Sequence, residues 1–213
     1  MIFFICRLKI NVKKKLSNII PEQQTGKAID AESSMELKNE NEAKEFFVKA
    51  KNRLQNVNQW RDYAGNISAD FQLVDKRGNE VQRDAAKGDY FKIDIPGPGS
   101  KSGDGYDWVE IEDEVSTSSA DSESFGFRVR PAENPTKVDD EVAHFYSPES
   151  TSSFIVERHK NKITVSIHDR NTKPNTNAAR TSDKVRDTVV GTAGVVAFSK
   201  IQWKNLTDGI LNL

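Results

Sequence analysis

The chain contains one cysteine, Cys6, and no long apolar run. A single cysteine excludes a disulfide within the chain and a cysteine-rich metal site. The apolar run Met1–Cys6 is far shorter than the about 20 residues that span a bilayer, and lysines follow it, whereas a secretory signal has its positive charges first. We therefore predict that residues 1–40 are a poorly ordered basic leader and linker without stable membrane insertion. A cytoplasmic location is the default expectation.

An excess of charge of one sign is also missing. The 31 Lys and Arg residues balance 32 Asp and Glu residues, which gives a net charge of −1. The chain therefore has no overall positive field that would attract nucleic acid. The basic stretch 158–186 contains few aromatic residues on which bases would stack. We expect no nucleic-acid partner.

Segment 88–108, GDYFKIDIPGPGSKSGDGYDW, is rich in glycine but lacks the spacing of a phosphate-binding loop. Gly97, Gly99 and Gly103 are spaced one residue too widely for a dinucleotide fingerprint, and a strand pattern follows where a helix is needed. The alternatives are a long hairpin loop and a mobile lid at the mouth of a pocket. The acidic stretch 104–123 lacks EF-hand spacing, and no histidine pair has zinc-site spacing. We expect no metal or cofactor.

The remaining pattern is two helices with strands between them. Residues 41–60 carry apolar side chains at steps of three and four, Asn39 or Asn41 is the expected cap, and Gly65 marks the end. A second long helix is expected from Ser182 to Leu206, with Val196 and Ile201 among its core-facing residues. The stretches between them alternate apolar and polar residues and read ADFQLVD, EVQRD, DYFKIDI, YDWVEIEDEV, SFGFRVRP, VAHFYS, SSFIVERH and KITVSIHD. Strands in series without helices between them predict an antiparallel sheet.

This order predicts one α+β domain over residues 41–213. Its curved antiparallel sheet of six to eight strands is gripped by the long C-terminal helix, which covers the apolar face. The helix AKNRLQNVNQWRDYAG, with Val57, Trp60 and Tyr63, and the terminal helix resemble the helix-grip fold of the START-like superfamily. That resemblance implies a cavity for a lipid or another hydrophobic small molecule, and it carries over no catalytic motif. A small barrel of the SH3 or OB type is the competing fold.

Candidate ligand-binding residues follow from the strands. Arg128 and Arg130 share one strand face, so they would hold an anionic ligand head if that face points into a cavity. His144, His168 and Arg170 would meet at one end of the sheet if their strands pair, which places a base beside a cation. Trp108 and Tyr146 complete the set. No residue is assigned as catalytic.

Three functions stay open. The chain binds a hydrophobic or amphipathic small molecule between sheet and helix, or it is an interaction module with a filled core, or it is a cyclase- or hydrolase-type enzyme that uses the same cavity. A closed apolar cavity under the C-terminal helix favours the first, and a solid interior favours the second. The sequence leaves the oligomeric state open.

Overall fold

The computed structural model describes residues 18–65, 69–95, 102–137, 141–175 and 192–213. Within this part of the chain, seven strands form one antiparallel sheet in the order β1-β7-β6-β5-β4-β3-β2. The bounds are β1 Lys27–Glu36, β2 Asp70–Val74, β3 Tyr90–Asp94, β4 Asp107–Ser118, β5 Ser122–Pro131, β6 Thr151–His159 and β7 Lys162–Thr172. The predicted α+β class with a curved antiparallel sheet and a C-terminal helix is confirmed.

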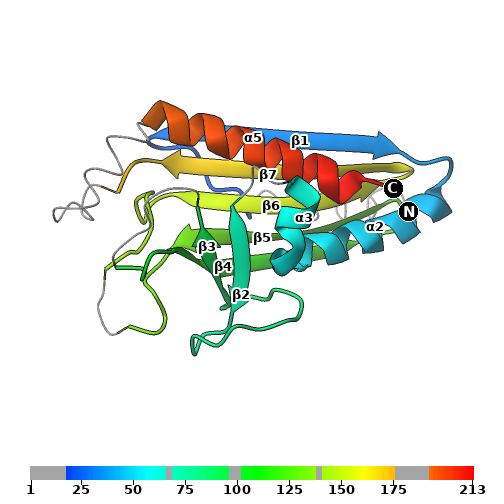
Figure 1. The fold of residues 1–213 in the computed structure, drawn as a ribbon. Coiled ribbons are helices and arrows are strands. Elements are labelled where there is room, and N and C mark those ends of the chain that lie inside the picture. The colour runs from blue at the N-terminus through cyan, green and yellow to red at the C-terminus, as the bar shows by residue number, and fades with distance from the viewer. Residues whose placement is uncertain (1–17, 66–68, 96–101, 138–140, 176–191) are drawn as a thin grey trace.

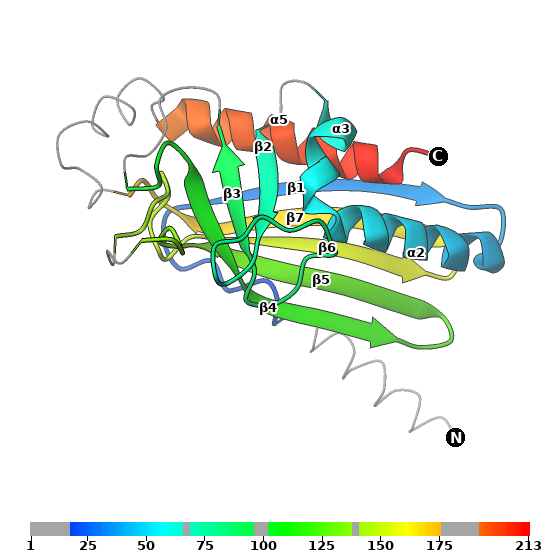
Figure 2. The ribbon, with the colours of Figure 1, turned by 60° about the horizontal axis from the view of Figure 1, so that its bottom comes forward.

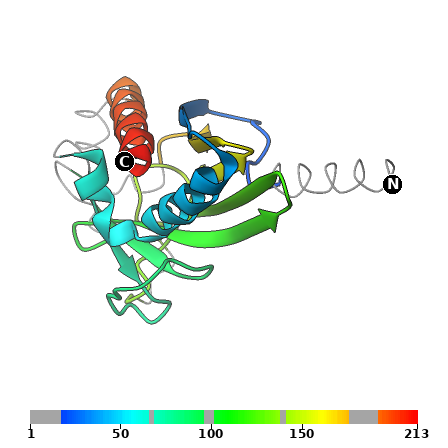
Figure 3. The ribbon, with the colours of Figure 1, turned by 90° about the vertical axis from the view of Figure 1, so that its right-hand side faces the viewer.

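The helices lie together on the inner side of the sheet (Figures 1 and 3). They are α2 Glu40–Gln55, the short 3-10 helix η1 Val57–Gln59, α3 Trp60–Ala64 and α5 Thr192–Leu211. Helix α5 packs along β1 and β7 and against α3, while α2 packs against β6. Figure 2 shows the long strands running below α5 in roughly the same direction as the helix. Two layers thus enclose one main core.

The first long helix begins where the sequence predicts. The Asn39 side chain accepts hydrogen bonds from the backbone N–H groups of Asn41 and Glu42, which satisfies two free donors of the first turn. The apolar positions then face the sheet and are buried at Ala43, Phe46, Phe47, Ala50 and Leu54. The helix ends at Gln55, earlier than predicted, and a second short helix continues to Ala64 before Gly65, whose φ of 82° suits glycine.

The two described residues that were predicted to face the core from α5 differ. Val196 is partly buried and packs against the main core, whereas Ile201 is 53% exposed. Trp203, Leu206 and Ile210 are buried, and polar residues share their face of the helix. Near the end of the helix, a side chain at Gly209 would collide with the Tyr63 carbonyl, so glycine lets α5 and α3 approach closely. The predicted start at Ser182 lies outside the described residues.

Three other predictions differ from the structure. Residues 27–36 of the expected linker form β1, which pairs with β7 along its length; the small and polar side chains of β1 hide its alternation. The return strand EVQRD is reduced to an isolated bridge between Val74 and Glu80. The stretch VAHFYS is not a strand, because its pairing is limited to a bridge between Tyr146 and Pro174.

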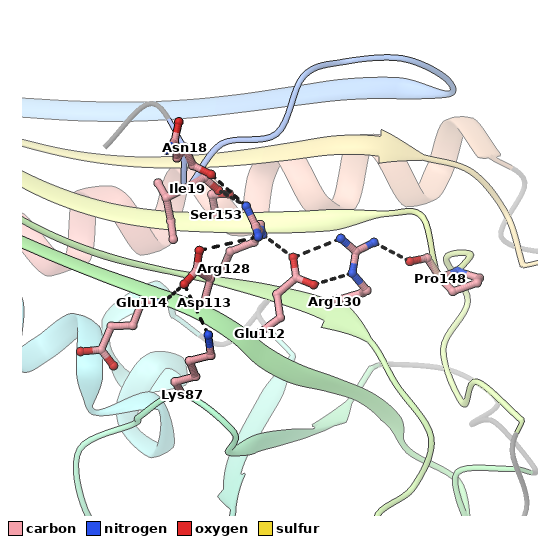
Figure 4. Close-up of polar contacts among 10 residues, drawn as sticks. All are labelled: Asn18, Ile19, Lys87, Glu112, Asp113, Glu114, Arg128, Arg130, Pro148 and Ser153. Atoms are coloured by element: carbon pink, nitrogen blue, oxygen red, sulfur yellow. Dashed lines mark hydrogen bonds and ion pairs between the residues drawn. The ribbon is translucent and has the colours of Figure 1, made fainter. Parts of the chain in front are cut away.

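The outer face of the sheet is covered in part by residues 18–25. Ile19 is buried against Val115 and Ile155. Its carbonyl accepts hydrogen bonds from Ser153 Oγ at 2.7 Å and Arg128 Nη1 at 3.2 Å (Figure 4). Both faces of the sheet therefore carry buried side chains.

Candidate functional site

A pocket of about 50 Å³ lies between the first half of α5 and the ends of the strands. Every strand from β2 to β7 contributes to it, together with the segment 144–146. Apolar and aromatic side chains make up most of its wall: Ala69, Phe71, Phe91, Ile93, Ile95, Val109, Val129, Phe145, Phe154, Phe198 and Trp203. The wall also contains a few polar groups, from Asp169, His144, Tyr146, Ser152, Ser199 and Gln202. Apolar walls with a few polar groups are typical of small-molecule sites.

Asp169 is the ionisable group of greatest interest in this wall. Its side chain is 1% exposed. Trp203 Nε1, on α5, donates a hydrogen bond to Asp169 Oδ2 at 2.9 Å, while Oδ1 is buried without a hydrogen-bond partner. Burial raises the pKa of Asp169 to about 6, although the nearby Ser152 hydroxyl and the Trp203 indole oppose that rise. Ser152 does not reach Oδ1 with hydrogen-bond geometry.

His144 and Tyr146 enter the pocket from the segment that precedes β6. The Tyr146 N–H donates to His144 Nδ1 at 2.9 Å, so Nδ1 is the unprotonated nitrogen of a neutral ring. The Tyr146 hydroxyl lies 3.5 Å from Ser199 Oγ on α5, and burial raises the pKa of this phenol well above its usual range. Both residues were predicted ligand contacts, and both line the pocket.

Aromatic side chains fill the centre of the space that the helices enclose. Trp60 is fully buried and stacks with Phe127 at a centroid distance of 6.2 Å. It also contacts Phe154 at 4.8 Å and Phe71 at 5.2 Å. The pocket lies at one end of this cluster, and about 50 Å³ has room for about three to five water molecules.

The structure places Trp108, Arg128 and Arg130 on the other face of the sheet. Trp108 packs with Val74 and Ala143, and its Nε1 donates to the Gly103 carbonyl. Arg128 and Arg130 both pair with Glu112 (Figure 4). The reason is strand alternation: Phe127 and Val129 alternate with the two arginines along β5 and are buried on the inner face of the sheet. The idea that this arginine face points into a cavity is therefore wrong for the pocket described.

His168 and Arg170 also lie outside the pocket. Both contact Asp30 Oδ1 on β1, at 2.6 Å from His168 Nδ1 and 2.8 Å from Arg170 Nη2. The predicted meeting of these two residues occurs, but His144 lies on the inner side with the pocket and does not join them.

Sequence reasoning missed Asp169, Ser199, Gln202 and Trp203. For Asp169 the signal was present: Ile163, Val165 and Ile167 alternate inward, and Asp169 follows in the same phase. For α5 the signal was weak, because polar Ser199 and Gln202 interrupt the buried stripe. Gln202 Oε1 accepts the Ala69 N–H at 3.0 Å, which ties α5 to the start of β2.

Among the described residues, no group of acidic, histidine or cysteine side chains is arranged to hold a metal ion. None of the helices in that part of the chain is long and apolar enough to cross a membrane.

No family model and no curated protein matches the sequence. The fold is similar to a hypothetical protein from Helicobacter pylori, at 12% identity and a TM-score of 0.48 over 90% of this chain and 91% of the other. It is also similar to norcoclaurine synthase from Thalictrum flavum, with 8% identity and a TM-score of 0.34 over 86% of this chain and 96% of the other. A third similar structure is major latex-like protein 151 from Panax ginseng, with 12% identity and a TM-score of 0.32 over 81% of this chain and 97% of the other. The likeness to these proteins is one of fold alone.

Proposed function

We propose that this chain binds a small, largely apolar molecule, or the end of a larger one, in the pocket between the sheet and α5. The observation that carries the proposal is the pocket wall itself. Apolar strand residues surround the space, and a few polar groups converge on it from β6, β7, α5 and segment 144–146. A wall of this composition favours an apolar body and fixes its orientation through hydrogen bonds.

The size of the pocket restricts the ligand. Typical small-molecule sites measure about 300–1,000 Å³, whereas this pocket measures about 50 Å³. Lipids, sterols and polyketides are therefore too large unless α5 moves away from the sheet. A molecule with a branched apolar body of a few carbon atoms and one polar group is the better match.

The aromatic cluster around Trp60 is the observation that favours a second candidate, an interaction module with a filled core. That candidate requires no ligand, so a binding experiment separates the two. An enzymatic role has less support, since His144 Nδ1 already accepts the Tyr146 N–H.

The test is a titration of the ¹⁵N-labelled full chain with isobutanol, followed by the indole N–H signals in NMR spectra. The chain has three tryptophans. Trp203 lines the pocket, and we expect its signal to shift until binding saturates. Trp108 lies on the other face of the sheet and is the internal control.

A matched pair of variants completes the test. Ser199→Phe places a ring in the pocket and should abolish the Trp203 shift. Ile201→Phe changes an exposed position of the same helix and should leave the shift intact. If wild type shows no saturable Trp203 shift with isobutanol or with its amine analogue, the binding proposal fails and the filled module is favoured.

A further inference from the structure

We propose that the polar group of the ligand is an amine, bound as an ammonium by Asp169 Oδ1. This inference rests on the binding function proposed above and adds the chemical class of the ligand. Its starting point is a single atom: Asp169 lines the pocket, and its Oδ1 is buried and accepts no hydrogen bond.

A buried carboxylate oxygen without a donor is costly, so a native structure that retains one calls for an explanation. Trp203 Nε1 fixes the other oxygen, Oδ2, and thereby holds the carboxyl group in place. The described residues that line the pocket include no lysine or arginine. Among the described residues, none that lines the pocket supplies a cation to Asp169, so the site is open to a cationic ligand.

The neighbouring groups match an ammonium better than a neutral hydroxyl. An ammonium carries three hydrogen-bond donors, and the hydroxyls of Tyr146, Ser199 and Ser152 are further acceptors in the same wall. Aromatic faces of Trp203 and Phe154, whose centroids lie 5.2 Å apart, add the electron density that attracts cations. An anionic ligand would instead meet the Asp169 carboxylate and be repelled.

The charge state of the site is compatible with this assignment. Burial raises the pKa of Asp169 to about 6, so the carboxylate is mostly ionised near neutral pH. The other charged or titratable groups around it are Arg170 on β7, Asp30 on β1, and His144 and Tyr146 in segment 144–146. Arg170 and Asp30 pair with each other on the outer face and partly cancel.

The experiment compares isobutylamine with isobutanol, which have the same shape, in the full chain at about pH 7.5. The Trp203 indole signal follows both titrations, since its N–H donates to the Asp169 carboxylate. We expect the amine to bind at least about tenfold more tightly, because hydrogen bonds between charged groups are the stronger class.

The decisive variant is Asp169→Asn, which keeps the size of the side chain and its acceptor for Trp203. It should remove the preference for the amine while isobutanol binding is retained. Asp94→Asn, which neutralises an exposed carboxylate on β3, is the matched control and should keep the preference.

The outcomes separate the two proposals. Equal binding of the two compounds, or a preference for the amine that survives in Asp169→Asn, overturns the amine assignment and leaves the pocket function standing. Binding of neither compound to wild type removes both. If Asp169→Asn does not fold, Ser152→Ala provides a second reading, because removal of one acceptor should weaken isobutylamine more than isobutanol.

Discussion

Asp169 carries a carboxyl group at an inward-facing position of β7, where the preceding inward residues Ile163, Val165 and Ile167 are apolar. Its burial and its raised pKa have one cause, the removal of the carboxylate from water. The folded chain therefore keeps a proton on this group at pH values where the unfolded chain has released it. The unfolding free energy therefore falls as pH rises through this range.

The first prediction concerns this pH dependence. Because the folded pKa is about 6 against an ordinary value of 3.8, the contribution of Asp169 is fully present below about pH 4 and is lost as pH rises through 6. Relative to Asp169→Asn, the wild type should lose about 2–3 kcal/mol of unfolding free energy between pH 4 and 7. Urea unfolding of both proteins across this range measures it. A constant difference between them would contradict the raised pKa.

At the scale of elements, the segment 18–25 behaves as part of the sheet's outer layer. Asn171, with a left-handed φ of 57°, holds its second half by accepting the N–H groups of Gln24 and Thr25. Ile19 anchors its first half in a small cluster with Val115 and Ile155. The outer face of the sheet thus depends on residues that precede the first strand.

The second prediction is that Ile19→Ala lowers the unfolding free energy by about 2–4 kcal/mol, because a buried aliphatic side chain leaves a cavity. Chemical denaturation of the purified chain measures the loss. Ile20→Ala, at the half-buried neighbouring position, is the control and should cost less. Equal losses for the two variants would show that Ile19 does not anchor the segment.

Periodicity in the sequence predicted most elements and their alternation, but not which face of the sheet the helices cover. Phe127 and Val129 alternate with Arg128 and Arg130 as expected. The pattern alone leaves open whether the arginines face a cavity, because an apolar inner face and a paired outer face give the same alternation. Strand β1 was missed because its small and polar side chains give a weak alternation, and its pairing with β7, far along the sequence, adds no local signal.

For the molecule as a whole, the filled centre sets the size of the pocket. Trp60 is fully buried and packs against Phe127 and Phe154 of the sheet, in space that a larger ligand would need. The chain therefore combines a sheet gripped by helices with an interior that is mostly solid.

The third prediction tests this limit. Trp60→Ala should lower the unfolding free energy by about 3–5 kcal/mol, and indole should restore part of it, since apolar cavities bind apolar rings. Thermal unfolding with and without indole measures the rescue. Wild type should gain nothing from indole, because its pocket of about 50 Å³ is too small. Equal stabilisation of wild type would show that Trp60 does not limit ligand size.

The pairing of β1 with β7 also affects how the chain folds during its synthesis. Thr172 Oγ1 donates to the Lys27 carbonyl across 145 positions of sequence, so β1 leaves the ribosome long before its partner exists. At about 5–20 residues per second, the delay is about 7–30 s. During that interval the strand has an open edge, and its lack of a strong apolar pattern reduces the risk that it pairs with another nascent chain.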